Sequence, residues 1–147
     1  NGGIACDTNK FTVADTTGNT AIAGTLTVSD NTSVAAGKTL TVGGPLILSK
    51  ASTTLSSGEL AVTHTWHEIN PNSQTLATAT GGTTGQILIL TATSADLTIT
   101  NTALGGGGTA NGFVGVTNNL EAANGDTVTY LYNGTQWQRL APYSHDN

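Results

Sequence analysis

Hydrophobic and polar positions alternate strictly along residues 18–28, "GNTAIAGTLTV", where Ile22, Leu26 and Val28 fall on one side and threonines on the other. A period of two is typical of a β-strand with one buried face. Glycine, asparagine and aspartate interrupt the pattern at short intervals, and these residues favour turns. The pattern therefore predicts a series of short strands over residues 11–48.

The same short unit occurs twice in this region. "AGTLTV" at residues 23–28 is nearly repeated as "AGKTLTV" at residues 36–42, about 13 residues later. In the second copy, Gly37 precedes Leu40 and Val42, which again share one side. The region therefore contains an internal repeat, with only two copies.

The apolar face of these short strands needs a cover. Some 40 residues of short strands, each with small side chains and a single apolar face, bury too little apolar area to offset an ordering entropy of about 1–2 kcal/mol per residue. The cover comes either from the second half of the chain or from identical chains placed around an axis, which also seals the strand edges. We take the second interpretation, and the predicted subunit interface comprises Phe11, Val13, Ile22, Leu26, Val28, Leu40, Val42, Leu46 and Leu48.

A family resemblance agrees with this interpretation. "NKFTVADTTGNTAIAGTLTV", residues 9–28, resembles the shaft repeats of tail fibres and tailspikes of phages that infect marine and aquatic bacteria. The likeness extends more loosely to Leu48. It implies an intertwined, homotrimeric β shaft, an extracellular position on the virion tail or surface, and other virion proteins as partners.

The strands that the sequence predicts become longer after residue 50. The Ser/Thr/Gly-rich stretch at residues 51–58 predicts a joint between a shaft (1–50) and a head (59–147). Seven short strands with frequent turn signals are typical of a β-sandwich or a jelly-roll-like head. The predicted strands are 59–69, 74–80, 85–93, 96–102, 112–118, 126–132 and 136–140.

The last two strands are joined by Asn133-Gly134. This dipeptide between alternating strands favours a two-residue type I′ hairpin, since both central residues need a positive φ. Counting outward from the turn pairs Tyr132 with Thr135. Tyr130, Tyr132 and Trp137 then share one face of the hairpin.

This aromatic face has two interpretations. Aromatic rings stack on the apolar side of sugars, so the three side chains are candidate contacts for a host-surface carbohydrate. Rings of this kind also fill the core of a small β domain and stabilise cross-strand pairs. The closing phrase at residues 125–140 resembles the last hairpin of small C-terminal head domains on phage fibres.

The segment "HTWHE" at residues 64–68 contains two of the three histidines. On a strand, His64, Trp66 and Glu68 share one face, and His67 points to the other. Because two histidines on opposite faces cannot bind one metal ion, no metal site is predicted here, and no cofactor is predicted for the chain. The segment is better suited to a sheet position near a joint or a subunit contact.

The composition supports an all-β fold. Of the 147 residues, 29 are threonine and 19 glycine, whereas only 9% are charged and 5% aromatic. Threonine favours strands and glycine favours turns, while strong helix formers are scarce. Disordered chains usually have the opposite bias, with many charges and few β-branched residues.

Charge and hydropathy exclude two classes of partner. The net charge is −5, and the four basic residues Lys10, Lys38, Lys50 and Arg139 are scattered along the chain. Nucleic-acid binding needs clustered cations, so no nucleic-acid partner is predicted. No apolar run reaches membrane-spanning length, so no membrane partner is predicted either. The single cysteine, Cys6, has no internal disulfide partner.

Nothing in the sequence predicts an enzyme. There is no G-x-S-x-G turn for a serine nucleophile, and most aspartates fall at turns or strand starts, where turn chemistry accounts for them. We therefore expect a structural fibre protein whose terminal head contacts the host surface. The alternatives are a self-polymerising filament or adhesin subunit that assembles by strand donation, and a monomeric carbohydrate-binding module.

Overall fold

The computed structural model describes residues 23, 25–102, 109–115 and 118–140. The chain divides into two compact units, Asn1–Gly43 and Gly44–Asn147. This boundary lies earlier than the predicted one at residue 50. The predicted interface residues outside the described part of the chain are Phe11, Val13 and Ile22.

The described part of the first unit contains no strand. Over residues 25–43 the backbone forms one hydrogen-bonded turn, in which the Lys38 N–H donates to the Ala35 carbonyl at 3.1 Å and Gly37 has a φ of +73°. Residues 44–49 are also outside any strand. The prediction of strands here is therefore wrong for the single chain, because a strand needs a hydrogen-bonded neighbour and none is provided within the described residues.

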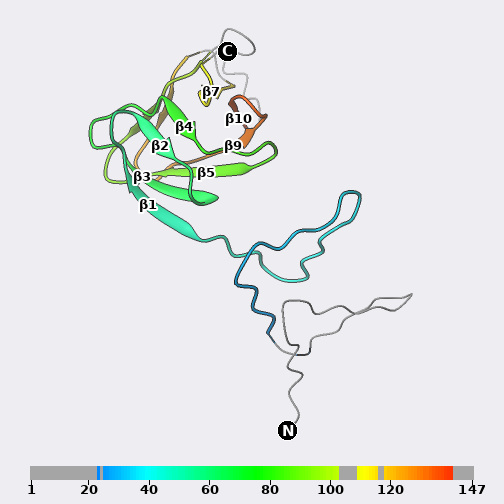
Figure 1. Cartoon of the computed structure of the whole chain (residues 1–147). Helices are drawn as coiled ribbons and strands as arrows, with labels where there is room; N and C mark the ends of the chain where they lie inside the picture. Colours follow the sequence, from blue (N-terminus) through cyan, green and yellow to red (C-terminus); the bar gives the residue numbers. More distant parts are fainter. Residues whose placement is uncertain (1–22, 24, 103–108, 116–117, 141–147) are drawn as a thin grey trace, which may run out of the picture. The chain divides into compact units, whose positions relative to one another are not determined.

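The second unit is all-β, as predicted, and its first half winds through three parallel rungs. Each rung contributes one strand to each of two layers: β1, β3 and β5 pair in parallel in one layer, and β2 pairs in parallel with β4 in the other (Figure 1). A parallel bridge between Leu76 and Ile99 joins the β4 segment to β6. The strands are β1 (Lys50–Thr54), β2 (Glu59–Ala61), β3 (Trp66–Asn70), β4 (Thr78–Thr80), β5 (Ile87–Ala92) and β6 (Leu97–Ile99).

In the second half of the unit, the chain reverses direction and its strands pair antiparallel with those of the third rung, β5 and β6. β8 pairs antiparallel with β6, and β9 pairs antiparallel with β5. β10 continues the large sheet as the antiparallel partner of β9 and the parallel partner of β7, giving the order β1-β3-β5-β9-β10-β7. The strands are β7 (Phe113–Val114), β8 (Leu120–Ala122), β9 (Thr127–Tyr132) and β10 (Trp137–Arg139).

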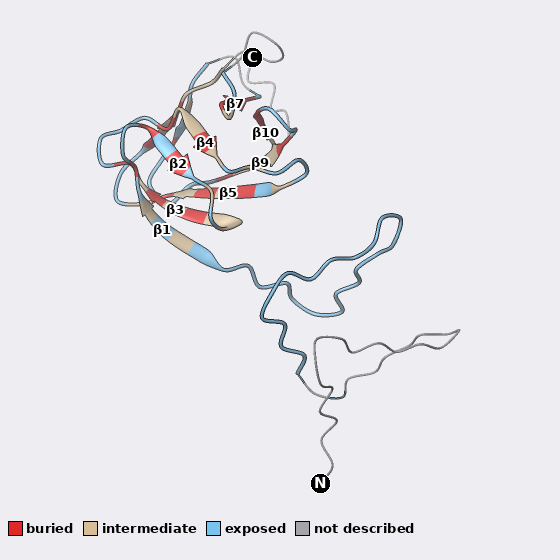
Figure 2. Ribbon diagram, in the orientation of Figure 1, coloured by how far each residue is buried: buried red, intermediate tan, exposed pale blue. Residues whose placement is uncertain are grey.

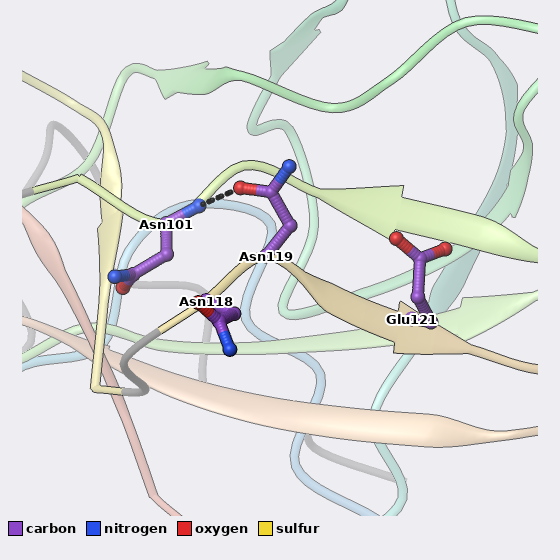
Figure 3. A pocket seen from close by; sticks show the side chains of 4 residues that line it. All are labelled: Asn101, Asn118, Asn119 and Glu121. Atoms are coloured by element: carbon purple, nitrogen blue, oxygen red, sulfur yellow. Dashed lines mark hydrogen bonds between the residues drawn. The ribbon is translucent and has the colours of Figure 1, made fainter.

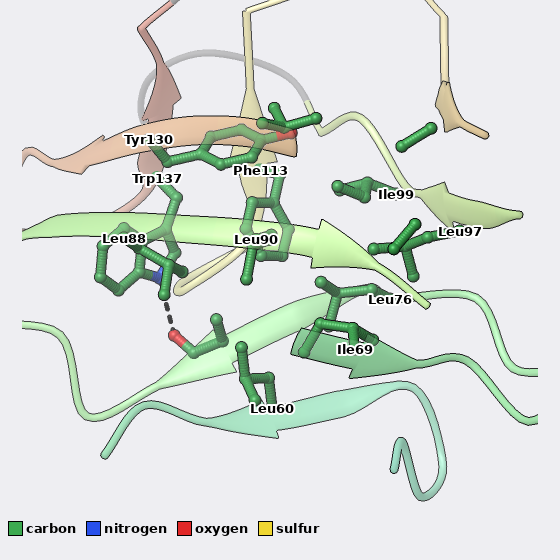
Figure 4. Packing of buried hydrophobic residues seen from close by; sticks show 14 of the residues in the cluster. Leu60, Ile69, Leu76, Leu88, Leu90, Leu97, Ile99, Phe113, Tyr130 and Trp137 are labelled. Atoms are coloured by element: carbon green, nitrogen blue, oxygen red, sulfur yellow. Dashed lines mark hydrogen bonds between the residues drawn. The ribbon is translucent and has the colours of Figure 1, made fainter. Parts of the chain in front are cut away.

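The core lies between the two layers, where alternate residues of each strand point inward (Figures 2 and 4). Leu60 and Ala79 of the small layer are fully buried, as are Leu88 of β5 and Trp137 of β10. Trp137 also donates its indole N–H to the Ala79 carbonyl at 2.8 Å, which ties the two layers together. The remaining core side chains include Leu55, Ile69, Leu76, Leu90, Ala92, Leu97, Ile99, Phe113, Ala122, Val128, Tyr130 and Tyr132.

The predicted joint is wrong, because most of residues 51–58 belong to the fold. Lys50–Thr54 form β1, paired with β3, and Leu55 is buried in the core. The predicted strand at 59–69 is two strands that lie in different layers, β2 and β3. The strand β8 was not predicted.

The last hairpin has a longer loop than predicted. Asn133 accepts hydrogen bonds at its side-chain oxygen from the N–H groups of Thr135 (2.9 Å) and Gln136 (2.8 Å), and only Gly134 of the predicted turn has a positive φ. The loop therefore contains four residues, and Tyr132 pairs with Trp137 instead of Thr135. Because the register shifts by two residues, the aromatic side chains still share one face.

The turn that leads into β2 requires glycine at position 58. Gly58 has a φ of +75°, and a Cβ there would lie 2.6 Å from the Thr75 carbonyl oxygen, whereas Gly85 has a φ of +85° with nothing within 4 Å of the same atom. We expect Gly85→Ala to lower the free energy of unfolding by about 1–2 kcal/mol, the cost of a left-handed alanine. Gly58→Ala should cost clearly more. Urea unfolding of the two variants tests this, and equal losses would contradict it.

Candidate functional site

An open polar recess lies where β6 ends and β8 begins (Figure 3). Its volume is about 500 Å³, and it is lined by Asn101, Asn118, Asn119 and Glu121. Three amides and one carboxylate offer both donors and acceptors of hydrogen bonds, together with a single negative charge. Such a lining suits a ligand that is rich in hydroxyl groups.

Two hydrogen bonds hold the residues of the recess in place. The Asn119 side-chain oxygen accepts from the Asn101 backbone N–H at 3.1 Å, which bridges the two strand ends (Figure 3). The Thr98 hydroxyl donates to Glu121 Oε2 at 2.6 Å across the β6–β8 pair. These contacts orient Asn119 and Glu121, which are exposed to solvent, as Asn118 is.

Asn101 also borders a small cavity of about 10 Å³ beside the core. Arg139 and the rings of Phe113 and Tyr130 line the same cavity. Within the described part of the chain, Asn101 Oδ1 and Arg139 Nε are buried without a hydrogen-bond partner. Burial in this apolar lining raises the pKa of the Tyr130 hydroxyl well above its ordinary value.

A second polar cluster lies on the outward face of the large sheet. Lys50 forms an ion pair with Glu68 at 2.6 Å and its ammonium lies 5.4 Å from the centre of the Trp66 ring. The hydrogen bond from Lys50, followed by that from Ser52, lowers the pKa of Glu68. The Trp66 indole donates to the Thr91 hydroxyl at 3.0 Å, so this face is internally satisfied.

The aromatic residues proposed as glycan contacts lie in the core. Tyr130 is 2% exposed and Trp137 0%, and Tyr132 packs against Trp137 with ring centres 4.8 Å apart. Tyr132 also donates its hydroxyl to the Asn111 side-chain oxygen at 2.8 Å. The glycan prediction for Tyr130, Tyr132 and Trp137 is therefore wrong, because buried rings cannot stack on a sugar, and the core interpretation is confirmed.

Of the prediction for "HTWHE", the opposite faces of His67 and of Trp66 and Glu68 are confirmed, whereas His64 lies in the bend before β3 and not on the strand. His67 points inward and is buried, whereas Trp66 and Glu68 of the same strand point outward. His67 Nε2 accepts from the backbone N–H groups of Thr63 (3.4 Å) and His64 (3.2 Å). Nδ1 therefore carries the proton of the neutral ring and donates a hydrogen bond to the Thr53 hydroxyl at 3.0 Å.

The buried His67 makes stability depend on pH. Burial, and then the nearby His64, lower the pKa of His67 below its ordinary value of 6.5. The unfolded chain therefore binds more protons than the folded one as the pH falls below 6.5, and stability is lost towards the lowered pKa of the folded state. We expect a lower urea midpoint at about pH 5 than at about pH 8. Unchanged midpoints, or the same difference in His67→Gln, would contradict this origin.

The described members of the predicted subunit interface have exposed side chains. Leu40 is 69% exposed and Leu46 70%, and the other members in this part of the chain are Leu26, Val28, Val42 and Leu48. Ile47, which was not in the predicted set, is 89% exposed. Isolated exposed leucines are ordinary, whereas several exposed apolar side chains along one segment are a feature that interaction surfaces share.

Sequence reasoning did not find the recess. Its signal in the sequence is the pair Asn118-Asn119 beside a short strand, which resembles any polar turn. No cluster of three or more His, Cys, Asp or Glu side chains within metal-binding distance occurs among the described residues. A helix with the length and hydrophobicity to cross a membrane is also absent from this part of the chain.

No protein-family model matches this chain, and the comparisons with curated proteins and with solved structures also found no match.

Proposed function

We propose that this chain is a subunit of a homotrimeric virion fibre, in which the N-terminal region forms a β shaft with two further copies. The all-β unit from Gly44 onward forms a terminal head that attaches to a glycan on the host surface. The fibre is extracellular, and its action is mechanical and adhesive. Three identical heads give avidity from individually weak contacts.

The observation that carries the proposal is the apolar surface of the N-terminal segment. Leu26, Val28, Leu40 and Val42 alternate with threonines and are all exposed in the single chain. Such a segment is stabilised when equivalent apolar residues of other copies cover it. The likeness of residues 9–28 to fibre shaft repeats favours three copies.

The recess formed by Asn101, Asn118, Asn119 and Glu121 replaces the buried aromatic face as the glycan contact of the head. Sugar hydroxyls both donate and accept hydrogen bonds, so amides and a carboxylate together fit them. The recess contains one carboxylate, whereas glycoside hydrolysis requires a pair, so the contact is one of binding.

The mass of the intact protein in solution tests the assembly. We expect light scattering to give a fixed mass of three chains over a wide range of concentrations. A mass of one chain would reject the fibre and favour a monomeric carbohydrate-binding module. A broad distribution of large masses would favour the open filament formed by strand donation, because head-to-tail contacts that do not close grow without limit.

Binding to a panel of oligosaccharides tests the recess. Glu121→Gln retains the size of the side chain but loses its charge, and we expect it to weaken the binding of the intact fibre at least several-fold. Asn124→Ala changes an exposed residue of the following turn that does not line the recess and serves as the control. Equal binding by both variants would reject this site.

A further inference from the structure

The first rung of the head, formed by β1 and β2, lies at the end of the stack and has a free edge. Within the described residues, β1 pairs only with β3, and β2 pairs with β4 and has one further bridge, from Glu59 to Ser56 of its own turn. Both layers therefore present a largely unpaired strand edge at the same end of the stack. Unpaired edges expose rows of backbone N–H and C=O groups, which can pair with another strand. The opposite end of the parallel stack is covered by the antiparallel strands β8 and β9.

The N-terminal segment contains a turn with the same backbone hydrogen bond and the same left-handed glycine as the turn that forms this rung, although Ser57 of the head turn is also left-handed (φ +57°) and Ala36 of the segment is not. In the head, the Glu59 N–H donates to the Ser56 carbonyl at 3.3 Å, and Gly58 is left-handed with a φ of +75°. In the segment, the Lys38 N–H donates to the Ala35 carbonyl at 3.1 Å, and Gly37 has a φ of +73°.

The apolar positions around the two turns also correspond. "VAAGKTLTV" at residues 34–42 matches "LSSGELAV" at residues 55–62 with one inserted residue. Leu55 and Leu60 are buried and Val62 packs against the core. Their counterparts Val34, Leu40 and Val42 are exposed by 45%, 69% and 47%. The two segments thus share an apolar pattern and a left-handed glycine at the corresponding turn position, but the turn types differ and only the second segment has a covering layer.

We propose that residues 34–42 of one copy stack as an additional rung on the β1–β2 edge of a second copy. Leu40 and Val42 then extend the apolar row of Leu60 and Val62, and the backbone of the added segment satisfies the open edge of β2. Three such contacts, each from one copy to the next, close a ring and leave no free edge. This inference depends on the proposed fibre, because it names the surface of the head that covers part of the apolar segment.

The chain length between the two elements permits the exchange. Seven residues, Gly43–Ser49, separate Val42 from β1, and they span up to about 25 Å when extended. Neighbouring strands lie about 5 Å apart, so these seven residues reach across several strand spacings without any unfolding of the head.

Disulfide trapping in the full-length chain tests the contact. In a Cys6→Ser background, Thr41→Cys is combined with Ala61→Cys, since alignment of Leu40 with Leu60 places these two exposed positions side by side on adjacent strands. Parallel neighbours at that spacing have the Cα separation that a disulfide needs. The control combines Thr41→Cys with Gln138→Cys, an exposed position on β10.

We expect mild oxidation to convert most of the Thr41→Cys/Ala61→Cys protein into covalent dimers and trimers on a denaturing gel, and the control to remain as single chains. Three results would overturn the inference: no cross-link, a cross-link within one chain, or equal cross-linking of the control. Light scattering on the same samples separates the two proposals. A trimer without the specific cross-link rejects only this contact, whereas a monomer rejects the fibre as well.

Discussion

Replacing Trp137 with alanine is expected to lower the free energy of unfolding by about 3–5 kcal/mol, which is the usual cost of deleting a large buried aromatic side chain. The Trp137 ring is fully buried, packs against Tyr132, and donates a hydrogen bond to the Ala79 carbonyl of the other layer. The substitution therefore opens a cavity and leaves a buried carbonyl without its donor. Urea unfolding followed by far-ultraviolet circular dichroism measures the loss.

The chain provides its own control in its other tryptophan. Trp66 lies on the outward face of the sheet, where its main partners are the Thr91 hydroxyl and the Lys50 side chain. Trp66→Ala should cost much less, about 1 kcal/mol, because water replaces both contacts. If the two alanine variants were equally stable, the assignment of the Trp137 ring to the core would be wrong.

Substituting Leu26 or Leu40 with aspartate is expected to convert the trimer into single chains, a threefold fall in mass by light scattering. In the proposed trimer, Leu26→Asp places three charges around the shaft axis, where they are desolvated and repel one another, and Leu40→Asp places a charge against the apolar row of a neighbouring head. The head should retain its circular dichroism spectrum, since neither residue belongs to its core.

The matched control for this experiment is Thr27→Asp. Thr27 is the neighbour of Leu26 and falls on the opposite side in a period-two pattern, so its charge should remain in water. We expect Thr27→Asp to remain trimeric. A trimer that survives Leu26→Asp and Leu40→Asp, or one that is lost equally in Thr27→Asp, would contradict the predicted apolar interface.

The fold class was predictable because threonine, glycine and the alternation of apolar and polar residues each favour strands or turns within a few residues of the chain. The strand at Ile87–Ala92 follows from its apolar run, but only alternate residues of the run are buried: Leu88 and Leu90 lie in the core, whereas Ile87 is 46% exposed. The parallel rungs were not predictable in this way, since short strands separated by turns fit many topologies. "KASTT" of β1 has no large apolar residue, and its place in the sheet depends on its pairing with β3.

The register of the last hairpin and the recess were missed for related reasons. The side chain of Asn133 accepts two backbone hydrogen bonds and thereby lengthens the loop, a local competition that dipeptide preferences do not capture. Asn101 and Asn119 are 18 residues apart and meet only because β6 and β8 pair. The sequence correctly predicted that the three aromatic side chains share one face of the hairpin. Whether that face is buried or exposed depends on the second layer of strands, which covers it.

The reversal of chain direction after β6 gives the head a polarity that matters during synthesis. The rung with the free edges, β1–β2, leaves the ribosome first, and the strands β8 and β9, which terminate the stack, leave it last. For the time needed to translate some 70 residues, at about 5–20 residues per second, both ends of the nascent stack are open to other chains. In the proposed fibre, copies translated side by side on one messenger meet while their edges are still unpaired, so that timing as well as affinity selects the partner.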